Sequence, residues 1–143
     1  MSRYLFVYGT LDPEHAPSEI APTVAKLRRV GSASVQGVLY DLGEYPGAVL
    51  TGQPKRKIPG TVFRIPDDPE VLQQLDEYEG FAPSNRDGSL FVRKVRPVKM
   101  ANGQILRCWV YTYNRPPGTA RVISGRSHRG KRLHVRERRR AAS

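Results

Sequence analysis

The sequence is poor in the residues that build disulfides and metal sites. It contains one cysteine, Cys108, so it cannot form an internal disulfide or supply a cysteine-rich zinc site. Its three histidines, His15, His128 and His134, lie too far apart in sequence to suggest a metal cluster. No nucleophile-elbow pattern and no glycine-rich phosphate loop occurs. These absences argue against a zinc protein, a serine hydrolase and a nucleotide-binding enzyme.

Long apolar runs are missing as well. The longest span about five residues, such as Tyr4 to Tyr8, whereas a membrane-crossing helix needs about 20. The chain enters a strand-like pattern in its first few residues, which leaves no room for a signal peptide. Together with the single cysteine, this pattern predicts a cytoplasmic protein without a membrane-spanning segment.

Acidic residues are scarce relative to basic ones, and the imbalance is concentrated at the C-terminus. The net charge is +11, yet residues 126–143 alone hold eight Lys or Arg and one Glu. Residues 1–125 are therefore only mildly basic, and the 38% hydrophobic content of the whole chain suits one folded domain. We expect a domain over 1–125 and a basic tail over 126–143. The tail is read as a solubilising extension, a contact to an acidic partner subunit, or an arm for nucleic acid.

Strands dominate the expected secondary structure. Residues 3–8 are apolar on both alternating faces, as in a strand buried on both sides. Asn102-Gly103 is a strong turn signal that joins strands at 91–100 and 104–113 into a hairpin. The remaining expected elements are helices at 19–29 and 70–78, strands at 34–41, 48–51 and 60–65, a turn at residues 43–47 and a loop at 82–89. This pattern predicts an α+β domain built on a curled or closed sheet, with Cys108 as a core residue in a strand.

The first candidate site is the segment Tyr8-Gly9-Thr10-Leu11. Here a buried strand ends abruptly in a glycine that is followed by a hydroxyl residue. Glycine lets the backbone approach a ligand closely, and successive N–H groups in such a turn can bind an anion or oxyanion. The alternative is that Gly9 only terminates the strand.

The second candidate site is the end of the second expected helix, at Leu75 to Phe81. If the helix ends at Gly80, Asp76 and Glu79 are three residues apart and share one face. Acidic residues at a helix C-terminus oppose its macrodipole, a small cost that packing alone would not select. A carboxylate crowded there should hold its proton more tightly than usual, as a general base near neutral pH requires. The alternative is a solvated acidic helix end.

In combination, four segments closely resemble the γ-glutamylcyclotransferase-like family, which includes the γ-glutamylamine cyclotransferases and the plant avirulence-induced proteins. The segments, in chain order, are Tyr8 to Leu11, Gly37 to Gly47, Leu75 to Gly80 and Val110 to Tyr113. The resemblance covers about residues 3–125. It implies a small mixed β-barrel with short flanking helices.

The resemblance also implies roles for particular residues. Glu79, directly before Gly80, matches the family's catalytic glutamate, whereas Asp76 and Glu77 are not expected to do chemistry. The residues that match substrate-binding positions are Tyr8, Gly9, Thr10 and Leu11 in the loop that cradles the γ-glutamyl group, Tyr111 in the pocket wall, and Tyr45 and Pro46 in a loop at the pocket rim. The chain departs from the family at Phe91, where relatives commonly carry tyrosine, and after Gly125, where the tail is unlike theirs.

The reaction implied is ring closure of a γ-glutamyl amine, amino acid or peptide to 5-oxoproline with release of an amine. The α-amine of the substrate is the nucleophile, so no metal or organic cofactor is called for. Two other functions stay open: a non-catalytic module on the same fold that binds a small metabolite, and nucleic-acid association through residues 126–143. The latter is less favoured because the body lacks a basic stripe with interleaved aromatics.

Overall fold

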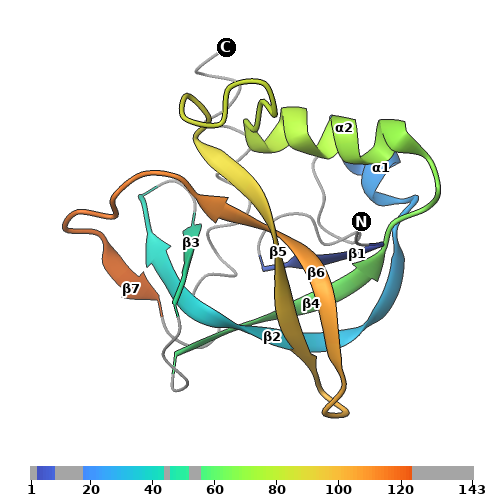
Figure 1. Ribbon diagram of the computed structural model, residues 1–143, viewed down its shortest axis with the longest axis horizontal. Helices are drawn as coiled ribbons and strands as arrows, with labels where there is room; N and C mark the ends of the chain where they lie inside the picture. The colour runs from blue at the N-terminus through green and yellow to red at the C-terminus, as the bar shows by residue number, and fades with distance from the viewer. Residues whose placement is uncertain (1–2, 9–17, 44–45, 52–55, 124–143) are drawn as a thin grey trace.

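The computed structural model describes residues 3–8, 18–43, 46–51 and 56–123, and Figure 1 shows their arrangement. The elements in chain order are β1 (Tyr4–Val7), α1 (Ala21–Val24), β2 (Arg28–Asp41), β3 (Pro46–Leu50), β4 (Lys57–Arg64), α2 (Pro69–Glu79), β5 (Phe91–Met100), β6 (Ile105–Tyr113) and β7 (Arg121–Ile123). Within these ranges, neither helix has the length and apolar character needed to cross a membrane.

Five strands close into a mixed barrel, as predicted. Their order is β2-β4-β1-β6-β5, and β5 returns to β2 through the pairs Ala33–Met100 and Ser34–Lys99. β1 and β6 run parallel, while the other barrel neighbours are antiparallel. The C-terminal part of β2, residues 37–41, leaves the barrel and pairs with β3 and β7 instead. The barrel is therefore closed at β2–β5 by a short contact, beyond which the two strands diverge.

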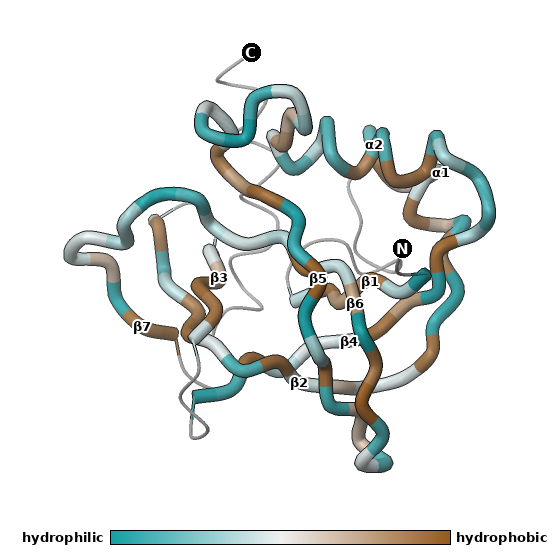
Figure 2. The backbone as a smooth tube through the Cα atoms, viewed as in Figure 1, coloured by the Kyte–Doolittle hydropathy of each residue, from teal (hydrophilic) through white to brown (hydrophobic). Residues whose placement is uncertain are grey.

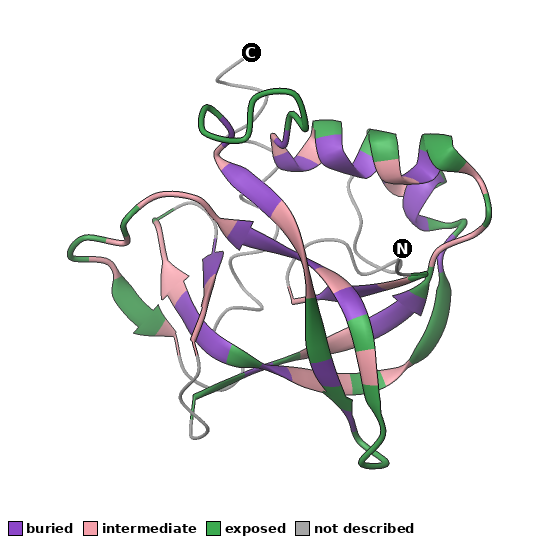
Figure 3. Ribbon diagram, in the orientation of Figure 1, coloured by how far each residue is buried: buried purple, intermediate pink, exposed green. Residues whose placement is uncertain are grey.

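Two hydrophobic cores lie on either side of the barrel wall. One draws on strand residues alone, such as Phe6, Val62 and Val110, and fills the barrel. The other includes α1 and α2 and packs these helices on the outer face of the wall. Leu5 and Phe6 of β1 belong to different cores and both are almost fully buried, which confirms the strand predicted to be buried on both sides. Figures 2 and 3 show that apolar and buried stretches coincide along most of the strands; β7 is an exception, because its apolar Val122 is exposed.

The longer helix, α2, begins and ends as its sequence predicts. The Asp68 carboxylate accepts a hydrogen bond from the Glu70 N–H at 3.0 Å, and Pro69 occupies the first turn, where its missing N–H costs nothing. Gly80 ends the helix with φ of 79°, a left-handed conformation that glycine adopts without strain. The chain then returns through residues 80–90 to the start of β5 (Figure 1). This fixed stop places Glu79 in the last turn.

Several boundaries differ from the sequence-based prediction, among them the start of β4, which is Lys57 rather than residue 60. The helix expected over 19–29 is only α1, and residues from Arg28 onward already belong to β2. The first residues of β2 are largely exposed and the strand has an irregularity between Arg29 and Gly31, so no apolar alternation marks its start. The Pro46-Gly47 pair lies in β3 rather than in a turn, and β7 was not anticipated. A Cβ on Gly47 would lie 2.6 Å from a Leu42 methyl carbon, so close packing explains this glycine.

Cys108 lies in the barrel core with no exposed surface, which confirms the sequence-based expectation. Burial raises the pKa of its thiol to about 12, so a negligible fraction is thiolate at pH 8. We expect the native protein to react with Ellman's reagent at least about 100-fold more slowly than a free thiol. The measurement is absorbance at 412 nm with and without denaturant. Full-rate labelling of the native protein would contradict this placement.

Candidate active site

The last turn of α2 directs two carboxylates inward. Asp76 and Glu79 are only 5% and 8% exposed, whereas Glu77 between them faces solvent. The spacing of three residues predicts this arrangement, since such positions share a helix face. The burial is unusual because ionised side chains avoid the interior unless they are paired or hydrogen-bonded.

Asp76 is held by two neighbours from the β5–β6 hairpin. Arg93 donates to both of its carboxylate oxygens, from Nε to Oδ1 at 2.8 Å and from a terminal nitrogen to Oδ2 at 3.0 Å. The Tyr111 hydroxyl donates to the same Oδ1 at 2.6 Å. Arg93 and Tyr111 are directly opposite each other in the ladder, so one strand pair presents both groups to the helix. The bidentate contact fixes the orientation of the carboxylate.

Aromatic rings hold the Arg93 guanidinium in place. Its central carbon lies 4.1 Å from the centroid of the Trp109 ring and 5.6 Å from that of Phe81. Sequence reasoning did not identify Arg93 as part of this site. A signal was available, because the hairpin centred on Asn102 places Arg93 directly opposite Tyr111, a residue already matched to the pocket wall. An ion pair that is stacked and largely buried in this way has a fixed geometry.

The Tyr111 hydroxyl interacts with both acids: it donates a hydrogen bond to Asp76, and the charge of Glu79 acts on it. Burial, the charge of Asp76 and the hydrogen bond to it, and then the charge of Glu79 raise the pKa of the Tyr111 phenol well above its ordinary value, against a smaller opposing effect of Arg93. Glu79 is therefore close enough to act on this hydroxyl electrostatically. Tyr111 stays protonated at neutral pH and can serve as a hydrogen-bond donor there.

The raised pKa of Tyr111 predicts a loss of stability at alkaline pH. Above the ordinary tyrosine pKa of 10.0, the unfolded chain releases this proton and the folded chain keeps it. The free energy of unfolding should therefore fall as the pH rises from 10, and Tyr111→Phe should make that fall shallower. Urea denaturation at pH 8, 9, 10 and 11 measures both slopes. Cys108 contributes in the same direction in both proteins, so the difference between the slopes isolates Tyr111. Equal slopes would contradict the prediction.

Tyr8 ties β1 to two other strands. Its hydroxyl donates to the Tyr111 carbonyl oxygen at 2.6 Å and accepts from the Ala48 N–H at 3.3 Å. Pro46, predicted to lie in a rim loop, is instead the buried first residue of β3, two residues from Ala48. The structure thus brings Tyr8, Pro46 and Tyr111 into one region at the ends of β1, β3 and β6. The other predicted binding residues lie outside the described ranges; they are Gly9, Thr10, Leu11 and Tyr45.

Phe91, the departure from the family pattern, is buried at the start of β5. Its ring packs at a tilt against Tyr113, with the centroids 5.6 Å apart. The two residues are also a cross-strand pair. The site therefore has an apolar contact where a tyrosine would bring a hydroxyl.

A cavity of about 720 Å³ opens beside these residues, between β2 and β3 on one side and β5 and β6 on the other. Thr112 and Tyr113, which follow Tyr111 in sequence, line it. Glu79 is not among its lining residues. Cavities of this size hold small organic ligands.

Comparison with known proteins identifies the fold and the family. No curated protein sequence matches the chain. Among solved structures, an AIG2-like protein from Mus musculus has 20% identity and a TM-score of 0.65, with 85% of each chain covered. A structure described as gamma-glutamyl cyclotransferase has 17% identity and a TM-score of 0.58, covering 85% of this chain and 70% of the other. YkqA from Bacillus subtilis has 23% identity and a TM-score of 0.59, over 80% of this chain.

The present chain spans only 36% of the length of YkqA. At these identities the structural matches establish the barrel fold and nothing finer. The sequence match is broader, since residues 5–130 match the family described as Gamma-glutamyl cyclotransferase, AIG2-like. The chain therefore belongs to the gamma-glutamyl cyclotransferase, AIG2-like family.

Proposed function

We propose that the protein converts a γ-glutamyl amine, amino acid or peptide into 5-oxoproline and a free amine, with Glu79 as the general acid and base. The observation that carries the proposal is the buried Glu79 carboxylate in the last turn of α2, whose charge acts on the Tyr111 hydroxyl, in a chain of this family. A buried carboxylate beside a fixed hydroxyl is a suitable proton acceptor and donor.

The burial and bonding of the two acids favour Glu79 over Asp76 for this role. Asp76 already receives three hydrogen bonds, two from Arg93 and one from Tyr111. Its oxygens are therefore occupied by donors of the protein itself, which leaves Asp76 poorly placed to take a proton from a substrate. Asp76 and Arg93 are therefore assigned to positioning Tyr111, and Glu79 to proton transfer.

The reaction needs no protein nucleophile. Glu79 takes a proton from the substrate's α-ammonium, and the freed nitrogen attacks the γ-carbonyl carbon to close a five-membered ring. The tetrahedral adduct then collapses as the bond from the γ-carbon to the amide nitrogen breaks. Glu79 gives the proton that it took from the α-ammonium to the departing amide nitrogen. The attacking nitrogen releases its second proton to solvent, from which the free amine takes up a proton. Binding the substrate in its folded shape holds the attacking nitrogen against the γ-carbonyl carbon.

The developing oxyanion requires hydrogen-bond donors. We assign this role to the backbone N–H groups of Gly9 to Leu11, which follow Tyr8 in sequence. The anchoring of Tyr8 to the Tyr111 carbonyl and to Ala48 supports this assignment, since it fixes the point from which that segment leaves β1.

The test is release of 5-oxoproline from a panel of γ-glutamyl amines, amino acids and peptides, followed by liquid chromatography. Turnover of any member is the expected result. Absence of turnover across the panel, with folding verified by circular dichroism, would reject the enzymatic proposal. In that case a thermal shift with 5-oxoproline would identify a binding module on the same fold, for which the loss of a hydroxyl at Phe91 is the favouring feature.

A further inference from the structure

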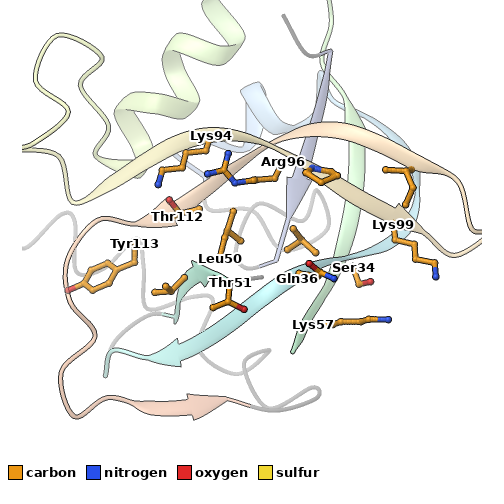
Figure 4. Close-up of a pocket in the computed structure, with 14 residues that line it drawn as sticks. Ser34, Gln36, Leu50, Thr51, Lys57, Lys94, Arg96, Lys99, Thr112 and Tyr113 are labelled. Carbon is orange, nitrogen blue, oxygen red and sulfur yellow. The ribbon is translucent and has the colours of Figure 1, made fainter. Parts of the chain in front are cut away.

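The cavity between β2–β3 and β5–β6 lies where the barrel wall opens. β2 and β5 pair at only two positions and then diverge, so the ladder does not cover this space. Figure 4 shows Lys94 and Arg96 along the β5 side, and Lys57 and Lys99 together at the opposite end. In this view Ser34 of β2 lies beside Lys57 and Lys99, and Gln36 of the same strand lies nearer the middle of the lining.

The charge of the lining has one sign. The lining includes the four cations Lys57, Lys94, Arg96 and Lys99, whereas none of the described lining residues is Asp or Glu. None of the four makes an ion pair in the described part of the chain, where the Asp76 carboxylate is paired with Arg93 instead. Cations grouped around a partly enclosed space attract anions more strongly than the same charges spread over a surface.

The rest of the lining suits an organic ligand rather than a bare ion. Val35, Val49 and Leu50 provide an apolar floor, and Thr51, Thr112 and Tyr113 provide hydroxyl groups. A volume of about 720 Å³ is sufficient for a small peptide. The cavity therefore fits an elongated molecule with an aliphatic body and several negative charges.

The cavity adjoins the residues assigned to the γ-glutamyl site. The Tyr8 hydroxyl bonds to backbone atoms of Tyr111 and Ala48, and the next residues in sequence, Thr112 and Val49, both line the cavity. The Tyr8 side chain, which directly follows β1, thus has its hydroxyl at one edge of this space. A substrate whose γ-glutamyl part lies near Tyr8 has the cavity available for the group on the other side of its amide.

We propose that this cavity binds the amine half of the substrate and selects an acidic one: an acidic amino acid, or a short acidic peptide, linked to the γ-glutamyl group. The inference rests on the proposed function and adds the substrate class. A lysine or polyamine leaving group would bring positive charge against four cations, and a neutral one would leave them without counter-charges. Acidic leaving groups are the class that this lining complements.

The decisive comparison is between γ-glutamyl-glutamate and γ-glutamyl-glutamine, which differ in shape very little and in charge by one unit. We expect kcat/KM to be about tenfold higher for the glutamate compound, as one charge-assisted contact would give. γ-Glutamyl-lysine should be poorer than both. Equal kcat/KM for the first two would overturn the inference while leaving the cyclotransferase function intact.

A charge-matched pair of double variants locates the effect. Lys94→Gln/Arg96→Gln should bring the ratio of the two kcat/KM values close to one. The control, Lys26→Gln/Arg28→Gln, removes the same charge at exposed positions at the α1 end of β2 and should leave the ratio unchanged. An equal effect of both variants would indicate a general field and would overturn the assignment to the cavity.

Binding to the full chain keeps the inference testable if no compound turns over. Calorimetry would then compare γ-glutamyl-glutamate with γ-glutamyl-glutamine on wild type and on the two double variants. Tighter binding of the glutamate compound, lost only in Lys94→Gln/Arg96→Gln, supports the anionic subsite even though the enzymatic proposal fails. Equal binding, or binding of neither, rejects the subsite as well.

Discussion

Replacing Glu79 with glutamine is expected to lower turnover of the best γ-glutamyl substrate by a factor of about 10²–10⁴, the usual contribution of a general acid–base group. Glutamine keeps the size and hydrogen-bonding capacity of the side chain but cannot carry a proton between the attacking and departing nitrogens. Because Glu79 is buried at the end of α2, the isosteric change preserves the local packing. The loss should therefore appear in kcat more than in KM.

Glu77→Gln is the matched control for this experiment. It makes the same chemical change two residues away, at an exposed position of the same helix end. We expect its kcat to be within about twofold of wild type, since it removes a surface charge only. Undiminished kcat in Glu79→Gln would contradict the proposed mechanism. Equal losses of kcat in both variants would show that the effect comes from the net charge of the helix terminus and not from proton transfer by Glu79.

The parts of the fold that could be predicted from the sequence are those with strong local signals. Asn102-Gly103 marks the turn between β5 and β6, and the position of this turn sets the register of the whole hairpin. Asp68, Pro69 and Gly80 mark both ends of α2 because caps and a left-handed stop each require particular residue types. These two elements carry most of the candidate site, so the shared face of Asp76 and Glu79 followed from their spacing, whereas the burial of that face decides against a solvated helix end.

The parts that could not be predicted depend on contacts between distant segments. β2 serves two sheets, and its exposed first residues give no period-two pattern, so its early start is set by pairing with β4. The place of Pro46 in β3 is likewise determined by pairing with Asp41. Arg93 was missed because cations in a strand that also holds Lys94 and Arg96 usually face solvent. Its placement depends instead on a carboxylate from α2 and a ring from β6.

Asp76→Asn is expected to produce the largest loss of stability of any single change at the site, about 3–5 kcal/mol. The substitution keeps the shape of the side chain but leaves the Arg93 guanidinium, which is 13% exposed, without its counter-charge. It also weakens the hydrogen bond from the buried Tyr111 hydroxyl, which now meets a neutral acceptor. Since domains of this size have about 5–15 kcal/mol of stability in total, the midpoint of urea denaturation should fall markedly.

Two further variants separate the ion pair from a general effect of losing an acid. Asp67→Asn, at an exposed position just before α2, should change stability by less than about 0.5 kcal/mol. Adding Arg93→Leu to Asp76→Asn should restore part of the lost stability, because it removes the unpaired buried charge and places an apolar side chain against Trp109 and Phe81. A double variant less stable than Asp76→Asn would show that the stacking of Arg93 on the rings, rather than its pairing with Asp76, stabilises this end of α2. The position of Tyr111 next to Glu79 would then depend on those rings rather than on the Asp76 carboxylate.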